Sequence, residues 1–118
     1  MSKKIALPKL ARDVLLLLEE AGEEEIAALA NTIYVETSGE KSTFMSELEM
    51  ALWSLYRNEY IEVLAYGKRL TWQDPELGHV LDLYSRLSAN ADGLFVWGSS
   101  TVGSASVSLT PTGLSNVF

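Results

Sequence analysis

The sequence predicts one α+β domain with a three-helix core, a small antiparallel β-sheet and an inserted helix. Three segments in the first half of the chain repeat apolar residues at the helical spacing of three and four. Residues 60–66 are instead rich in β-branched and aromatic side chains, which favour strands. A length of 118 residues and an apolar share of 47% suit a single globular core. We therefore expect residues 1–118 to form one domain.

The three predicted helices are bounded by residues that favour helix ends. Pro8 suits the first position of a helix, because its fixed φ is helical and its missing N–H is not needed there. Gly22 and Gly39 are natural stops. The acidic run at 23–25 favours the positive end of a following helix dipole. The expected helices span about 8–21, 24–38 and 43–58.

Strands are expected after the third helix. The first lies at about 60–66 and ends at a glycine. A β-hairpin is expected at about 94–109, in which Leu94–Trp97 pairs with Ala105–Leu109, because glycines and serines between them tolerate a turn. These strands are predicted to form the small sheet and its wing-like extension.

An inserted helix is expected between the first strand and the hairpin, at about 74–88. Asp74 is a good N-cap and Pro75 a good first residue. Tyr84 falls on the apolar face of this helix, so we expect it in the core. The same expectation holds for three other aromatic residues, Phe44, Trp53 and Phe95.

Two motifs in this order of elements resemble the winged helix-turn-helix domains of prokaryotic regulator-like proteins. One is Leu52–Val63, where a helix passes directly into a strand and Asn58 or Glu59 stands at a position where glycine is common. The other is Leu109–Gly113 (LTPTG), whose Thr-Pro pair fits an N-cap followed by a first helical residue. The resemblance implies a winged-helix-like fold, in which the third helix enters the DNA major groove and the wing contacts the backbone.

The charge of this chain argues against that activity. Residues 1–66 carry 12 acidic and 6 basic side chains, a net charge of −6, whereas residues 67–118 carry 4 and 3, a net charge of −1. Residues 43–59, which contain the expected third helix, hold three acidic residues against one arginine. A protein that approaches DNA normally supplies lysine and arginine to neutralise phosphates. The acidity is therefore concentrated where DNA would bind.

The leading hypothesis is a non-catalytic winged-helix module for protein interaction or regulation. Two tryptophans flank the inserted helix in polar or glycine-rich surroundings, where an exposed aromatic ring favours a protein interface. A homodimer is also expected, from the habit of the family and the frequency of twofold dimers. The candidate interface residues are Glu47, Glu49, Arg57, Trp72 and Trp97.

The alternative is a DNA-binding transcriptional regulator that uses the wing and the basic N-terminus. Scattered, solubilising surface charges are the simpler interpretation of these basic residues. The candidate nucleic-acid contacts are Lys3, Lys4, Lys68, Arg69 and Arg86.

No catalytic residue, cofactor or metal site is predicted, and we do not expect an enzyme. The chain has no cysteine, which excludes a disulfide framework and cysteine-based zinc sites. His79, the sole histidine, would need a partner such as Asp82 to act as a base, and a surface or interhelical histidine is the simpler interpretation. The apolar run at 14–18 is too short for a membrane span or signal segment. We therefore expect a soluble, cytoplasmic protein.

Overall fold

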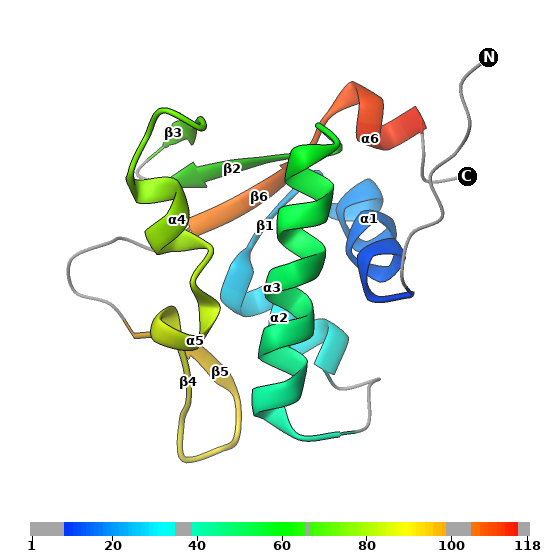
Figure 1. Cartoon of the computed structure of the whole chain (residues 1–118). Coiled ribbons are helices and arrows are strands. Elements are labelled where there is room, and N and C mark those ends of the chain that lie inside the picture. Colours follow the sequence, from blue (N-terminus) through cyan, green and yellow to red (C-terminus); the bar gives the residue numbers. More distant parts are fainter. Residues whose placement is uncertain (1–8, 35–38, 66, 99–104, 116–118) are drawn as a thin grey trace.

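The computed structural model describes residues 9–34, 39–65, 67–98 and 105–115, and it confirms a mixed α+β fold (Figure 1). The helices are α1 (Lys9–Ala21), α2 (Ile26–Tyr34), α3 (Lys41–Arg57), α4 (Glu76–Val80), α5 (Leu83–Arg86) and α6 (Pro111–Ser115). The strands are β1 (Glu23–Glu25), β2 (Ile61–Ala65), β3 (Lys68–Leu70), β4 (Leu87–Ala89), β5 (Phe95–Trp97) and β6 (Ala105–Leu109). Residues 1–8, 35–38, 66, 99–104 and 116–118 lie outside this description.

Two antiparallel sheets are present in the described part of the chain. The larger has the strand order β1-β6-β2-β3, and the smaller pairs β4 with β5. Alternate residues of β2 and β6 are buried, so one face of the larger sheet lies against the core. The predicted small antiparallel sheet is thus confirmed.

Helix α3 lies in the middle of the molecule, between α1 on one side and the α4–β5 segment on the other (Figure 1). Its buried face consists of apolar residues at helical spacing, as predicted. They are Phe44, Leu48, Ala51, Leu52 and Leu55. α3 thus has neighbours on both flanks, while Glu47, Met50 and Arg57 remain exposed.

The predicted start of the second helix is wrong. The acidic residues Glu23–Glu25 form strand β1, and α2 begins only at Ile26. Glu24 lies opposite Val107, so β1 adds an edge strand to β6. This pairing with a strand near the other end of the chain supplies backbone hydrogen-bond partners that outweigh the helix-dipole preference of three carboxylates. The predicted end at residue 38 lies outside the described residues.

The predicted hairpin of Leu94–Trp97 with Ala105–Leu109 is also wrong. β5 pairs with β4, whereas β6 pairs with β1 and β2. The side chain of Asn31 on α2 helps to keep β5 apart from β6. Its amide accepts a hydrogen bond from the Phe95 N–H (2.6 Å) and donates one to the Phe95 carbonyl (2.9 Å). The Phe95 ring also packs edge-on against Tyr34. These contacts hold β5 on α2, away from β6.

The predicted inserted helix is broken into α4, α5 and β4. Asp82, between the two helices, has φ −85° and ψ 77°, which is not helical. The side chain of Asp74 does not cap α4; it turns back toward β3. Tyr84 is 66% exposed, so its assignment to the core is wrong, while Phe44 and Phe95 are buried as predicted. Trp53 is half-buried and packs against the core.

The Thr-Pro motif at the end of β6 forms the predicted cap. The Thr110 Oγ1 atom accepts a hydrogen bond from the Gly113 N–H (2.9 Å) at the start of α6. The same hydroxyl donates to the Glu59 carbonyl (2.5 Å). Glu59 has a φ of 61°, the left-handed conformation that favours glycine. The resemblance to winged-helix domains likewise puts a position where glycine is common at Asn58 or Glu59.

No helix in the described ranges is both long and apolar enough to cross a lipid bilayer.

Candidate protein-binding surfaces

Three aromatic rings meet at one end of α3, and we call Trp53, Tyr56 and Trp72 the aromatic corner. Trp53 and Tyr56 are three residues apart on α3 and therefore lie on the same side of the helix. Trp72 follows β3 and stacks on Trp53, with ring centroids 5.7 Å apart and an interplanar angle of 22°. Its ring also meets Tyr56 edge-on at 5.0 Å. Trp72 nevertheless stays 62% exposed.

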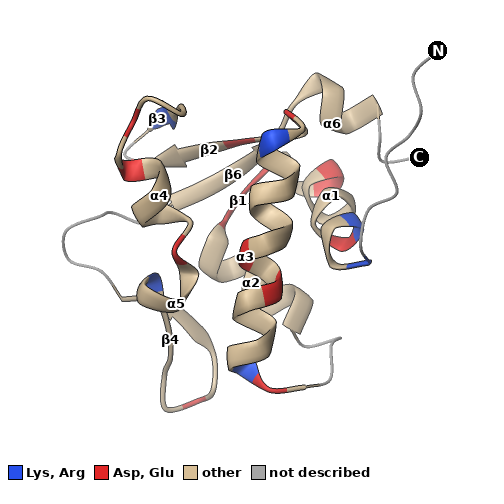
Figure 2. Ribbon diagram, in the orientation of Figure 1, with Lys and Arg blue, Asp and Glu red and all other residues tan. Residues whose placement is uncertain are grey.

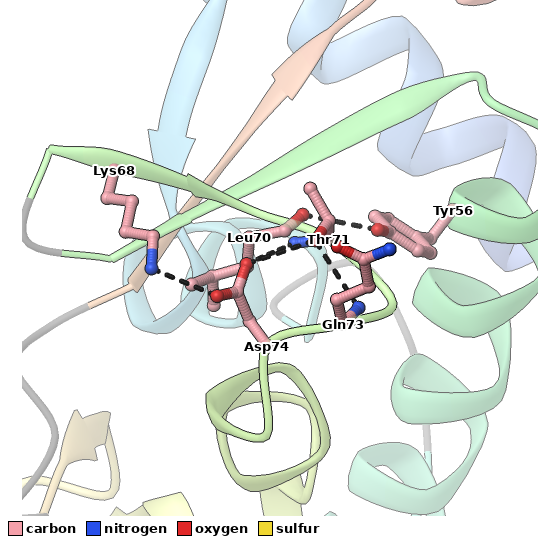
Figure 3. A network of polar contacts seen from close by, with 6 residues as sticks. All are labelled: Tyr56, Lys68, Leu70, Thr71, Gln73 and Asp74. Carbon is pink, nitrogen blue, oxygen red and sulfur yellow. Dashed lines mark hydrogen bonds and ion pairs between the residues drawn. The ribbon is translucent and has the colours of Figure 1, made fainter.

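The turn that carries Trp72 is fixed by a polar network around Asp74 (Figure 3). The Asp74 carboxylate accepts hydrogen bonds from the backbone N–H of Thr71 (2.8 Å) and from the Thr71 hydroxyl (3.1 Å). The Lys68 ammonium donates to the other carboxylate oxygen at 2.9 Å. The Tyr56 hydroxyl donates to the Leu70 carbonyl at 3.1 Å, which joins α3 to the same turn. These hydrogen bonds thus fix the position of the turn that carries Trp72.

The protonation states in this network match its hydrogen bonds. The pKa of Asp74 lies below its ordinary value, mainly because the Thr71 N–H and then Lys68 donate to the ionised carboxylate. The pKa of Lys68 is raised by its hydrogen bond to Asp74. Burial, assisted by the Asp74 charge and opposed by Arg69, raises the pKa of the Tyr56 phenol. Tyr56 therefore stays a hydrogen-bond donor at neutral pH.

An open cavity of about 330 Å³ adjoins the aromatic corner. Tyr56 and Trp72 form an aromatic side of it, and Glu59 and Glu62 contribute carboxylates. Arg69 also lines the cavity and forms an ion pair with Glu62 at 3.1 Å. With two acids and one base, the charged lining has a net charge of −1. Aromatic faces and carboxylates both attract cations.

A second candidate surface lies on the side of α3 that faces α1. Glu47, Met50, Ser54 and Arg57 are spaced by three, four and three residues, and we call them the α3 stripe. At 3.6 residues per turn they fall within an arc of about 80°. Together with Leu10, Ala51 and Lys9, they line a groove of about 560 Å³. Met50 is 67% exposed.

The five predicted interface residues do not lie together on one surface. Glu47 and Arg57 line the same groove, and Trp72 belongs to the aromatic corner. Glu49 does not contribute to either surface, because its carboxylate accepts a hydrogen bond from the Leu83 N–H (2.8 Å) and anchors α5 on α3. Trp97 is half-buried on β5, opposite Leu87. The predicted interface is therefore not one continuous surface.

Two functional candidates were missed by the sequence reasoning. Met50 is not among the predicted interface residues, although it is exposed and occupies the same stripe as Glu47 and Arg57. Glu59 was noted for its backbone position but not as part of a site. The signal for Met50 was its spacing from Glu47 and Arg57, whereas nothing local placed Glu59 beside Trp72.

The three candidate DNA contacts that the structure describes are each engaged by a partner within the chain. Lys68 pairs with Asp74 at 2.9 Å, Arg69 pairs with Glu62, and the Arg86 side chain donates to the His79 carbonyl at 2.9 Å. Figure 2 shows the basic positions on four separate elements, α1, α3, β3 and α5, interspersed with acidic ones. Lys3 and Lys4 lie outside the described residues.

The candidate base and its partner are both at the surface. His79 on α4 is exposed, and the Asp82 carboxylate accepts a hydrogen bond from the Ser85 hydroxyl at 2.9 Å. Within the described ranges, no group of three or more potential ligand side chains is placed to hold a metal ion.

No family model matches this sequence, and neither a curated protein nor a solved structure is similar to it.

Proposed function

We propose that this chain is a non-catalytic protein-interaction module of winged-helix-like architecture, and that its cavity at the aromatic corner accepts a basic side chain of a partner protein. The element order supports this architecture, because three helices are followed by β2 and by a later strand, β6, that pairs with β2. The Thr-Pro cap that leads into α6 supports it further. In this proposal β3 to β5 are an insertion within the wing. The cytoplasmic location expected from the sequence remains part of the proposal.

The observation that carries this function is the exposure of Trp72. A ring that stacks on Trp53 and contacts Tyr56 remains 62% exposed, beside carboxylates of Glu59 and Glu62. Indole rings are large apolar surfaces that are enriched at binding hot spots. A guanidinium or ammonium group placed over such a ring gains a cation–π interaction, and nearby carboxylates add charge-assisted hydrogen bonds.

The environment of α3 disfavours insertion of this helix into DNA. Trp72 covers the side chains of Trp53 and Tyr56, and α5 is hydrogen-bonded to Glu49. Lys68 and Arg69 are already paired with acids, so DNA phosphates would compete with internal partners. The alternative of a DNA-binding regulator is therefore less well supported than protein binding.

The proposal is tested with two short peptides that differ in one charge. Acetyl-Gly-Arg-Gly-amide presents a guanidinium, and the citrulline analogue has nearly the same shape without the charge. In a titration followed by the indole ¹H–¹⁵N resonances, the arginine peptide should shift the Trp72 signal in a saturable and salt-sensitive way, because the attraction is screened by ions. The citrulline peptide should cause little shift.

Two variants separate the aromatic corner from general peptide binding. Trp72→Ala should lower the affinity for the arginine peptide about tenfold or more, as expected for loss of an aromatic anchor. Tyr84→Ala removes an aromatic ring of similar exposure on α5 and should leave the affinity unchanged. Equal shifts with both peptides, or equal effects of both variants, would contradict the cation site. Tight, salt-sensitive binding of random duplex DNA at physiological ionic strength would contradict the functional class.

A further inference from the structure

We propose that two copies of this chain associate through the α3 stripe, with the two α3 helices antiparallel about a twofold axis. The proposal concerns a surface separate from the aromatic corner and does not depend on cation binding there. Its basis is that the stripe is complementary to itself.

The complementarity follows from residue positions along α3. Glu47 and Arg57 lie five positions before and after Leu52, and Met50 and Ser54 lie two positions before and after it. A twofold axis that crosses an antiparallel helix pair at the level of Leu52 therefore sets Glu47 opposite Arg57 of the second copy. The same operation sets Met50 opposite Ser54. Both contacts occur twice, as in any isologous interface.

The apolar part of the interface is supplied by Met50 and the groove. Met50 projects from α3 with 67% exposure, whereas Ser54 opposite it is small. The groove beside Ser54 is bordered by Leu10 and Ala51 and has a volume of about 560 Å³, so it accommodates an unbranched methionine side chain. Each copy thus provides one projecting side chain and one groove to receive its counterpart.

The charged ends of the stripe set the direction of the helices. In the described part of the chain, neither Glu47 nor Arg57 forms an ion pair. They are ten residues apart, about 15 Å along the helix axis, so each charge is free to meet the opposite charge of the second copy. A parallel arrangement would instead bring like charges together and is disfavoured. Charge and shape therefore favour the same antiparallel register.

Sedimentation velocity over a range of concentrations tests this inference. The wild-type chain should show a monomer–dimer equilibrium, and Met50→Glu should raise the dimer dissociation constant about tenfold or more, because it places two carboxylates in the apolar part of the interface. Glu76→Arg, on the exposed surface of α4, should leave the equilibrium unchanged. Circular dichroism confirms that each variant is folded.

A charge exchange tests the antiparallel register. Glu47→Arg and Arg57→Glu should each weaken the dimer, because each places like charges opposite one another, and the double variant should restore it. Wild-type chain that stays monomeric at millimolar concentration would overturn the inference. A dimer that is insensitive to Met50→Glu would do the same, and failure of the double variant to restore association would overturn the antiparallel register. Trp72→Ala should dimerise normally, which distinguishes this surface from the aromatic corner.

Discussion

The aromatic corner and the α3 stripe lie on the same helix but differ in how their side chains are held. Trp72 is fixed by stacking on Trp53 and by a turn that is closed around Asp74. Met50 projects from α3 without such a support and has three rotatable bonds. The two surfaces differ because different elements pack beside α3: β3 and its following turn bring Trp72 onto one side, whereas α1 borders an open groove on the other.

This difference bears on what each surface recognises. A preorganised site loses little conformational entropy on binding, so the aromatic corner suits a small charged group. The α3 stripe depends on the burial of apolar area together with charge pairing, so it suits a larger and complementary surface. A variant that alters one surface should therefore leave the other intact, unless it disturbs the fold beneath both.

The largest effect is expected from Gly113→Ala, which disturbs the fold beneath both surfaces where α6 packs on the backbone of Tyr60. A Cβ atom at this position would lie 2.0 Å from the Tyr60 carbonyl oxygen and 2.8 Å from Leu109 Cδ1. The backbone must shift, so we expect a loss of about 3 kcal/mol in the free energy of unfolding, measured with urea. Gly78→Ala is the control: nothing lies within 4 Å of its added Cβ, and it should stabilise α4 by up to about 1 kcal/mol. Equal losses would refute the close-contact explanation.

Glu59→Gly should stabilise the fold and weaken cation binding at the aromatic corner. Relief of the positive φ at residue 59 is expected to raise the free energy of unfolding by about 1 kcal/mol. Loss of the carboxylate should reduce the affinity for the arginine peptide severalfold and leave dimerisation unchanged. Glu59→Ala removes the carboxylate without the conformational relief, so it should bind as weakly but unfold more easily than Glu59→Gly. Unchanged peptide affinity in both variants would exclude Glu59 from the site.

Arg69→Gln should strengthen cation binding at the aromatic corner. Arg69 forms an exposed ion pair with Glu62, and such a pair contributes less than about 1 kcal/mol to the free energy of unfolding. Its removal frees Glu62 for the ligand, and the affinity for the arginine peptide should rise about threefold in the indole titration. Arg57→Gln is the matched change on the α3 stripe: it should weaken the dimer and leave peptide affinity unchanged. A weaker peptide complex in Arg69→Gln would show that Arg69 supports binding.

The smallest effect expected is a local change at low pH in the turn that carries Trp72. The folded pKa of Asp74 lies below its ordinary value of 3.8, so its contribution to stability is fully present above that value and is lost as the pH falls through the lowered pKa. The Trp72 indole resonance should therefore move below about pH 3.8, as the hydrogen bonds from Thr71 and Lys68 weaken. Asp74→Asn should remove this movement and leave dimerisation at neutral pH unchanged. A movement that persists in Asp74→Asn would assign the titration to another group.

The candidate surfaces were only partly predictable from the sequence. Exposure of Trp72 was inferred from its polar neighbours, and Glu47 and Arg57 from the polar face of α3. The contacts of these residues involve distant parts of the chain: Trp72 meets Tyr56 because the β2–β3 pairing returns the chain to the end of α3. The hydrogen bond of Glu49 to Leu83 likewise joins residues far apart in the sequence, so no local signal could remove Glu49 from the predicted interface.

The α+β class, the apolar face of α3 and the Thr110–Pro111 cap that leads into α6 were all predictable from the amino-acid sequence. Their signals are local, because helical spacing and capping act over one or two turns of chain. Three other features were not predictable: Glu23–Glu25 form a strand, β5 pairs with β4 instead of β6, and the expected inserted helix is interrupted at Asp82. Those outcomes depend on backbone partners and packing supplied by distant segments, which override local preference.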